Sequence, residues 1–83
     1  MNFELRLFLP RDPRYAAMIR GVAEHAARYA GSGGANAERF GNDVEAAARV
    51  QLTASGGEVP VTVRRNAGPL EVQIDRQTIS LDL

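Results

Sequence analysis

The apolar residues of this chain change their spacing twice, and this change limits the folds that its 83 residues can adopt. Near the N-terminus they alternate, with Phe3, Leu5, Leu7 and Leu9 at every second position. From Tyr15 onward they recur at every third or fourth position, and alternation returns in the last third of the chain. A period of two is typical of a half-buried strand, and a period near 3.6 is typical of an amphipathic helix. The sequence therefore predicts a strand, then a helical region, then further strands.

The first strand, over residues 3–9, is followed by the start of a helix. Pro10 ends the strand, Asp12 can cap the free amides of a helix, and Pro13 fits the first helical position, where the missing N–H costs nothing. Arginines and a glutamate on the opposite face predict a solvated surface. The expected apolar stripe of this helix consists of Tyr15, Ile19, Val22, Ala26 and Tyr29.

A second helix is predicted after the glycine-rich segment GSGG at residues 31–34, which ends the first. Asn36 is its expected cap, and the helix should fray near residues 53–57. Small residues in its stripe favour close packing against the first helix or the sheet. That stripe consists of Ala37, Phe40, Val44, Ala47 and Ala48.

Three more strands are predicted in the last third of the chain. Alternation over residues 59–64 and 70–75, around the turn NAGP, indicates a hairpin, and residues 79–83 alternate again after a turn near Arg76. Pro60 belongs at a strand start or on a sheet edge, because proline has no N–H to donate to a ladder.

Each predicted strand has one apolar face and each helix one apolar stripe, so both helices must cover the same side of the sheet. The predicted fold is a single α+β domain over residues 1–83, a two-layer sandwich with two helices on one face of an antiparallel four-stranded sheet. The bare face should carry Glu4, Arg6, Thr62, Arg64, Glu71, Gln73 and Ser80.

Composition excludes several classes of function. Ten basic residues, all arginine, balance ten acidic ones, which argues against nucleic-acid and membrane-surface partners. The chain has no cysteine, His25 is its only histidine, and no apolar run approaches the ~20 residues of a membrane helix. A domain this small has a modest core, so an oligomer is the expected source of further stability. We expect a cytoplasmic protein, with His25 beside Met18 at the margin of the apolar stripe.

Three stretches resemble the bacterial anti-sigma-factor serine kinases of the histidine-kinase-like (GHKL) ATPase superfamily. They are LRLFLPRDPRYAAMIRGVAEHAARYAG, FGNDVEAAARV and VPVTVRRNAGPLEVQIDRQ, which are similar to the opening, the nucleotide helix and the central hairpin of that family. The likeness covers residues 3–77.

The resemblance implies a nucleotide site, but the positions that should form it have changed. The family's helix carries Glu-x-x-x-Asn, whose amide oxygen helps to bind magnesium; Glu45 matches the glutamate and Arg49 stands at the asparagine. A guanidinium has no acceptor and cannot ligate a cation. The family's adenine-binding aspartate should fall at the next inward position of the hairpin, where Arg76 stands, while Asp75 points to the other face. No catalytic residue, cofactor or metal is therefore expected.

Two interpretations of these positions stay open. Glu45 and Arg49 have the i,i+4 spacing of an ordinary helical ion pair, and Asp75 is typical of a turn. Alternatively, Arg49 and Arg76 belong to a remnant site that still has some affinity for anions.

The leading functional prediction is a non-enzymatic protein–protein interaction module in bacterial regulation or scaffolding. The resemblance implies a sigma factor or a STAS-type antagonist as partner. A strand over residues 3–9 at a sheet edge also offers a physical route to a homodimer, formed through this edge or through an exposed helix surface. Antiparallel self-pairing would place Glu4 near Arg6 of its mate. The interaction residues are Phe3, Glu4, Leu5, Arg6 and Leu7.

Two alternatives belong to other classes of protein. A residual ATP-binding serine kinase or ATPase would need Glu45 to work without its amide partner. A KH-like RNA-binding domain has the order strand, helix, Gly-x-x-Gly, helix, strand, strand, and GSGG at 31–34 fits that spacing. That loop carries no basic residue, and the chain is neutral, so RNA binding is the weaker alternative.

Overall fold

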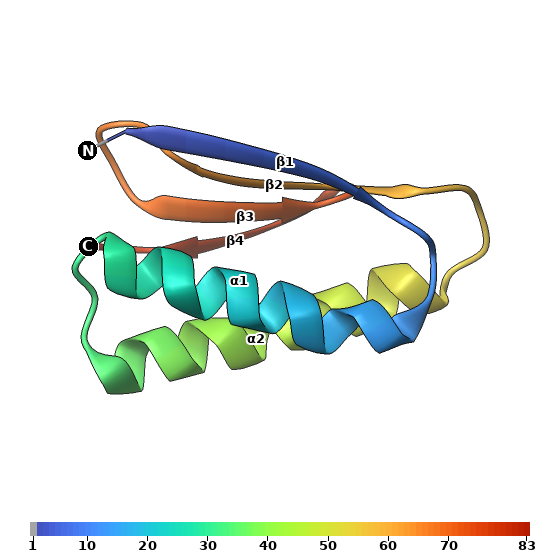
Figure 1. Ribbon diagram of the computed structural model, residues 1–83, viewed down its shortest axis with the longest axis horizontal. Coiled ribbons are helices and arrows are strands. Elements are labelled where there is room, and N and C mark those ends of the chain that lie inside the picture. Colours follow the sequence, from blue (N-terminus) through green and yellow to red (C-terminus); the bar gives the residue numbers. More distant parts are fainter. Residues whose placement is uncertain (1) are drawn as a thin grey trace.

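The computed structural model describes residues 2–83 and arranges them in two layers, a sheet above a pair of helices (Figure 1). The predicted fold class, an α+β sandwich with a four-stranded antiparallel sheet, is confirmed. The elements are β1 (Phe3–Leu9), a short 3-10 helix η1 (Pro13–Tyr15), α1 (Ala16–Tyr29), α2 (Gly34–Thr53), β2 (Val59–Arg65), β3 (Leu70–Ile74) and β4 (Gln77–Leu81).

The strands lie in the order β1-β2-β3-β4, and each pairs antiparallel with the next. The register places inner-face residues in rows across the sheet, one of which runs through Leu5, Val63, Val72 and Ile79. Alternation in each strand therefore puts apolar side chains on the helix side in every strand at once. The order leaves β1 and β4 as the two edges.

The core lies between the two middle strands and the helices. The inner residues of β2 and β3 are buried, whereas β1 contributes only Leu9 to the fully buried set. All five residues of the predicted second-helix stripe are buried. The buried apolar residues are Leu9, Ala16, Ile19, Ala23, Ala27, Ala37, Phe40, Val44, Ala47, Ala48, Leu52, Val59, Val61, Val63, Leu70, Val72 and Ile74.

The predicted cap before the first helix is present, but the first turn is a 3-10 helix. The Asp12 carboxylate accepts a hydrogen bond from the backbone N–H of Arg14 at 3.0 Å, and Pro13 occupies the first position. The Arg14 side chain donates two further hydrogen bonds to the same carboxylate. These bonds, the side-chain ones above all, lower the pKa of Asp12 below its ordinary value because they favour the charged form.

The connection between the helices is shorter than predicted. Gly31, with φ of 99°, ends α1; its N–H bonds to the carbonyl of Arg28, and the N–H of Ser32 bonds to the carbonyl of Ala27, as in a Schellman motif. α2 begins at Gly34, so the prediction of Asn36 as its cap is wrong. Gly33 takes the capping position in extended conformation, without a side-chain cap.

Gly41 of α2 lies directly against the Glu24 side chain of α1. A Cβ atom built there would lie 2.5 Å from Cγ of Glu24 on α1. The buried alanines of both helices contribute to the same close approach, because small side chains let the backbones come together. The prediction that the small residues mark close packing therefore holds between α1 and α2.

Candidate functional site

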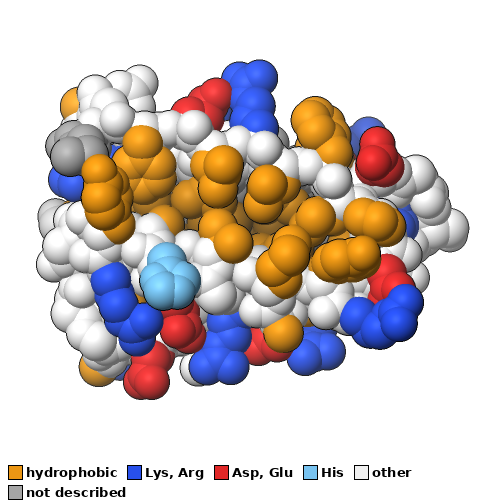
Figure 2. All heavy atoms as spheres, viewed as in Figure 1, with side chains coloured by type: hydrophobic (Ala, Val, Ile, Leu, Met, Phe, Trp, Pro, Cys, Tyr) orange, Lys and Arg blue, Asp and Glu red, His pale blue; other side chains and the backbone are white. Residues whose placement is uncertain are grey.

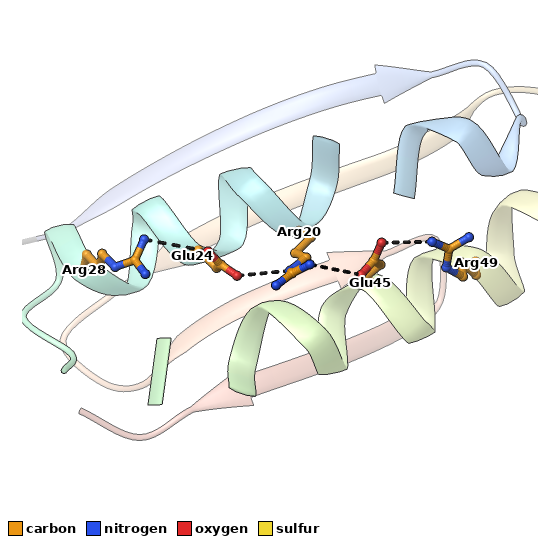
Figure 3. A network of polar contacts seen from close by, with 5 residues as sticks. All are labelled: Arg20, Glu24, Arg28, Glu45 and Arg49. Atoms are coloured by element: carbon orange, nitrogen blue, oxygen red, sulfur yellow. Dashed lines mark hydrogen bonds and ion pairs between the residues drawn. The ribbon is translucent and has the colours of Figure 1, made fainter. Parts of the chain in front are cut away.

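Glu45 and Arg49, the two positions of the expected nucleotide helix, form an ion pair on one side of α2. Nη2 of Arg49 lies 3.0 Å from Oε2 of Glu45, one helical turn away (Figure 3). Both side chains face the neighbouring helix α1 in Figure 3. The structure thus contains the i,i+4 helical ion pair that the spacing of Glu45 and Arg49 predicts.

The pair belongs to a chain of five charged side chains that crosses between the helices (Figure 3). Arg20 of α1 lies 3.8 Å from Oε1 of Glu45 and 3.1 Å from Oε1 of Glu24. Arg28 closes the chain, 3.7 Å from the other oxygen of Glu24. Each carboxylate is largely buried and stands between two guanidinium groups, so both oxygens of Glu45 are already engaged.

The ion pair offers no oxygen ligand at position 49. A magnesium ion bound there needs oxygen ligands, and Arg49 supplies only donors and a positive charge. Within residues 2–83 no group of three or more histidine, aspartate or glutamate side chains is placed to hold a metal ion.

Asp75 and Arg76 lie in the tight turn between β3 and β4. β3 ends at Ile74, which pairs with Gln77, so the prediction that position 76 is the next inward strand residue is wrong. Asp75 has φ of 55°, and its N–H bonds to the carbonyl of Pro60 at 2.9 Å. This left-handed conformation accounts for an aspartate at position 75, because its short polar side chain tolerates a positive φ.

Arg11 is the partner of Asp75, and no motif or spacing in the sequence predicted this contact. Its Nη2 lies 3.9 Å from Oδ2 of Asp75, while Nε and Nη1 donate to the carbonyls of Gly57 and Gln51 at 2.9 and 2.6 Å. This nearly buried guanidinium joins the end of α2 and two loops. Among the interactions within residues 2–83, none joins Asp75 or Arg76 to Glu45 or Arg49.

The GSGG loop borders a shallow hollow that also contains Arg65, Asn36 and Asp82. The loop sequence itself has no basic residue, but Arg65 lies beside it. The loop sequence could not predict this neighbour, because Arg65 comes from the end of β2. Its Nη1 donates to the carbonyl of Ala30 at 3.5 Å, and Asp82 adds a carboxylate to the same hollow.

The predicted interaction residues Phe3, Glu4, Leu5, Arg6 and Leu7 all lie on β1, at an edge of the sheet. Their apolar members point to the helix side but are incompletely covered; Leu5 keeps 44% of its surface exposed. The sandwich is therefore open along β1.

An apolar groove of about 500 Å³ follows this opening between β1 and α1. Figure 2 shows the hydrophobic side chains as a band across this face of the molecule, with charged side chains outside it. The groove is lined by Phe3, Leu5, Val22, His25, Ala26, Tyr29 and Val63.

The sequence predicted an exposed helix surface only in general terms and did not identify the side chains of α1 that form this one. Tyr29, expected as a core aromatic, is 65% exposed, and its ring meets that of Phe3 edge-on at 5.8 Å between centroids. Met18 is 43% exposed at the same flank. A signal was present: Tyr15, Met18, Val22, His25 and Tyr29 recur at alternating steps of three and four, which marks a second apolar face beside the buried one.

Comparison with protein-family models, with curated proteins and with solved structures gave no match. The likeness to the anti-sigma-factor kinases thus stays a hypothesis that rests on the sequence stretches themselves. No helix within residues 2–83 is long and apolar enough to cross a bilayer.

Proposed function

We propose that this chain is a non-enzymatic protein–protein interaction module in bacterial regulation or scaffolding, related to the anti-sigma-factor kinases but without their use of ATP. The observation that carries the proposal is the open apolar side of the sandwich between β1 and α1. A free strand edge beside an apolar groove is the kind of surface that binds protein segments by adding a strand.

The surroundings of Glu45 support a non-enzymatic role over a residual kinase. To orient a water or hydroxyl, Glu45 would have to leave both Arg20 and Arg49. Arg49 would also place its charge where the family binds magnesium. Titration calorimetry with magnesium ATP tests this point, and we expect no heat of binding at millimolar nucleotide.

The resemblance suggests the partner: a sigma factor or a STAS-type antagonist. We expect immobilised protein to bind a purified member of one of these classes from the same genome in biolayer interferometry. Leu5→Asp should abolish the signal, because it places a charge in the groove. Val50→Asp is the matched control, since Val50 is 63% exposed on α2 and does not line the groove. Binding of magnesium ATP, or binding of neither class of protein, would contradict the proposal.

A further inference from the structure

One hydrogen bond between β2 and the turn after β3 shows which backbone groups of β1 point toward the open edge of the sheet. The N–H of Asp75 donates to the carbonyl of Pro60, so the backbone polar groups of Pro60 face β3. Phe8 of β1, directly opposite Pro60, therefore stands in a non-hydrogen-bonded pair. Because bonding direction alternates along a strand, Glu4, Arg6 and Phe8 turn their N–H and C=O groups toward the open edge.

The same alternation places charged side chains on one face of β1 and apolar side chains on the other. Glu4 and Arg6 lie on the outer face, where Nε of Arg6 is 2.8 Å from Oε2 of Glu4. Phe3, Leu5 and Leu7 lie on the inner face, beside the groove. Any strand added to this edge must thus present opposite charges outward and apolar side chains inward.

A second copy of β1 meets both demands. From these observations we infer that two copies of this chain pair antiparallel through β1, with the two-fold axis at Leu5, and so join their sheets into one. This inference rests on the proposed function as an interaction module and assigns the open strand edge to a second copy; the apolar groove beside it is the surface left for a sigma factor or STAS-type antagonist. In this register Glu4 forms its hydrogen-bonded pair with the partner's Arg6, and Leu5 meets the partner's Leu5.

Charge selects this register over its neighbours. Residues directly opposite in an antiparallel pair share a face, so a two-fold axis must pass through a residue. An axis at Glu4 or at Arg6 would set like charges directly opposite each other, which destabilises a pair. An axis at Leu7 would set Glu4 opposite the partner's Pro10, which has no N–H to donate. Only the axis at Leu5 gives two pairs of opposite charge.

The inner face closes in the same arrangement. Phe3 lies opposite the partner's Leu7, and both α1 helices fall on one side of the joined sheet because both cover the inner face. The two grooves then face each other across the axis, and α1 contributes the half-buried Val22 of the groove and the exposed Met18 to the shared space. The other sheet edge offers less, since β4 is shorter than β1 and its inward residues Ile79 and Leu81 are half-buried, whereas Leu5 of β1 is exposed.

The absence of native cysteine allows a clean test by single-cysteine cross-linking in the full chain. Leu5→Cys should give an interchain disulfide on mild oxidation, because the two positions face each other in a non-hydrogen-bonded pair. Leu7→Cys is the matched control on the same strand and face. In this register its two copies are offset by four residues, about 14 Å along the strand, beyond the ~7 Å limit for a disulfide. Cross-linking of Leu7→Cys in preference to Leu5→Cys overturns the inference.

The mass of the protein in solution, and the effect of reversing charges on β1, provide a second test. Light scattering should give twice the 9.0 kDa mass of the chain at about 100 µM. Arg6→Glu should raise the dimer Kd on the order of tenfold, because it sets like charges opposite. The double variant Glu4→Arg with Arg6→Glu should restore the wild-type Kd. Circular dichroism of each variant verifies folding, and an unrestored Kd in a folded double variant contradicts the assigned register.

The two proposals fail separately. A monomer at high micromolar concentration that still binds a sigma factor or STAS-type antagonist overturns the dimer and leaves the proposed function intact. A wild-type dimer by light scattering that binds neither class of protein supports the dimer and overturns the proposed partner.

Discussion

Arg20 of α1 lies beside Glu45 of α2, with 3.8 Å between Nη1 and Oε1 (Figure 3). Arg49 takes the other oxygen of Glu45 at 3.0 Å. Glu45 is therefore held from two sides by positive charge. Its present role in the structure is to connect the two helices.

Replacing Arg20 should weaken this connection by a small amount. Arg20→Met keeps the apolar stem but removes the charge, and we expect a loss of up to about 1 kcal/mol in the free energy of unfolding, because the Arg20 side chain is 41% exposed. The loss should shrink as salt rises to about 1 M, since salt screens partly exposed charges. Urea unfolding followed by circular dichroism measures it. Arg39→Met, at an exposed position of α2, is the control; an equal loss there would show that the network contributes nothing.

Two helical glycines should respond differently to alanine. Gly21→Ala should stabilise the fold by about 0.5–1 kcal/mol, because nothing lies within 4 Å of the new Cβ and alanine favours the helix. Gly41→Ala should lack this gain, because its Cβ would displace the Glu24 side chain from Arg20 and Arg28. Thermal and urea unfolding of both variants provide the comparison.

The cause of the Gly41 effect can be tested in a second background. If Glu24 is the obstacle, Gly41→Ala should become stabilising when it is combined with Glu24→Ala. A Gly41→Ala variant that stays unfavourable in that background would mean that the helix backbones themselves are in conflict.

Arg11 should be far more sensitive to substitution than an exposed arginine. Arg11→Lys removes the fork that reaches the carbonyls of Gln51 and Gly57, so we expect a loss of about 1–3 kcal/mol from unsatisfied groups that are partly buried. Arg76→Lys, in the exposed turn, should change stability by less than about 0.5 kcal/mol. Denaturant unfolding measures the free energy of unfolding of both variants. Equal losses in the two would contradict the role of Arg11 in connecting α2 to the loops.

The cap at Asp12 should make part of the stability pH-dependent. Because Arg14 lowers the pKa of Asp12 in the folded state, ionised Asp12 stabilises the protein above the unfolded-state pKa, near pH 4. That contribution is lost as the pH falls through the lower pKa of the folded state. Asp12→Asn keeps an acceptor but does not titrate at this position. The stability difference between wild type and Asp12→Asn should therefore shrink as the pH falls from about 7 to 2, and a constant difference would contradict the assignment.

Much of the fold could be predicted because each strand and helix carries its own periodic signal. Val59, Val61 and Val63 alternate, and all three are buried on the helix side. The cap at Asp12 was also predictable, because its partner Arg14 is two residues away. The start of α2 was not, since Gly33 can cap a helix through backbone conformation alone, without a side-chain signal.

The candidate site was less predictable, since it depends on residues far apart in the chain. The pair of Glu45 and Arg49 follows from helical spacing, but the third member, Arg20, is 25 positions before Glu45 and comes from another helix. Asp75 likewise meets Arg11 only because the ends of β1, α2 and β3 converge.

The sequence alone determined which face of each strand and of α2 is apolar, because side-chain direction follows the local backbone period. In α1 only Ile19 of the predicted stripe is buried, and the buried face consists of Ala16, Ile19, Ala23 and Ala27. Only the tertiary structure decided that the sandwich stays open along β1. Leu5 and Leu7 have the same alternation as Val61 and Val63, yet Leu5 remains exposed because its strand is at the edge and α1 does not cover it fully. Burial depends on where the layers sit relative to each other, and no local pattern encodes that position.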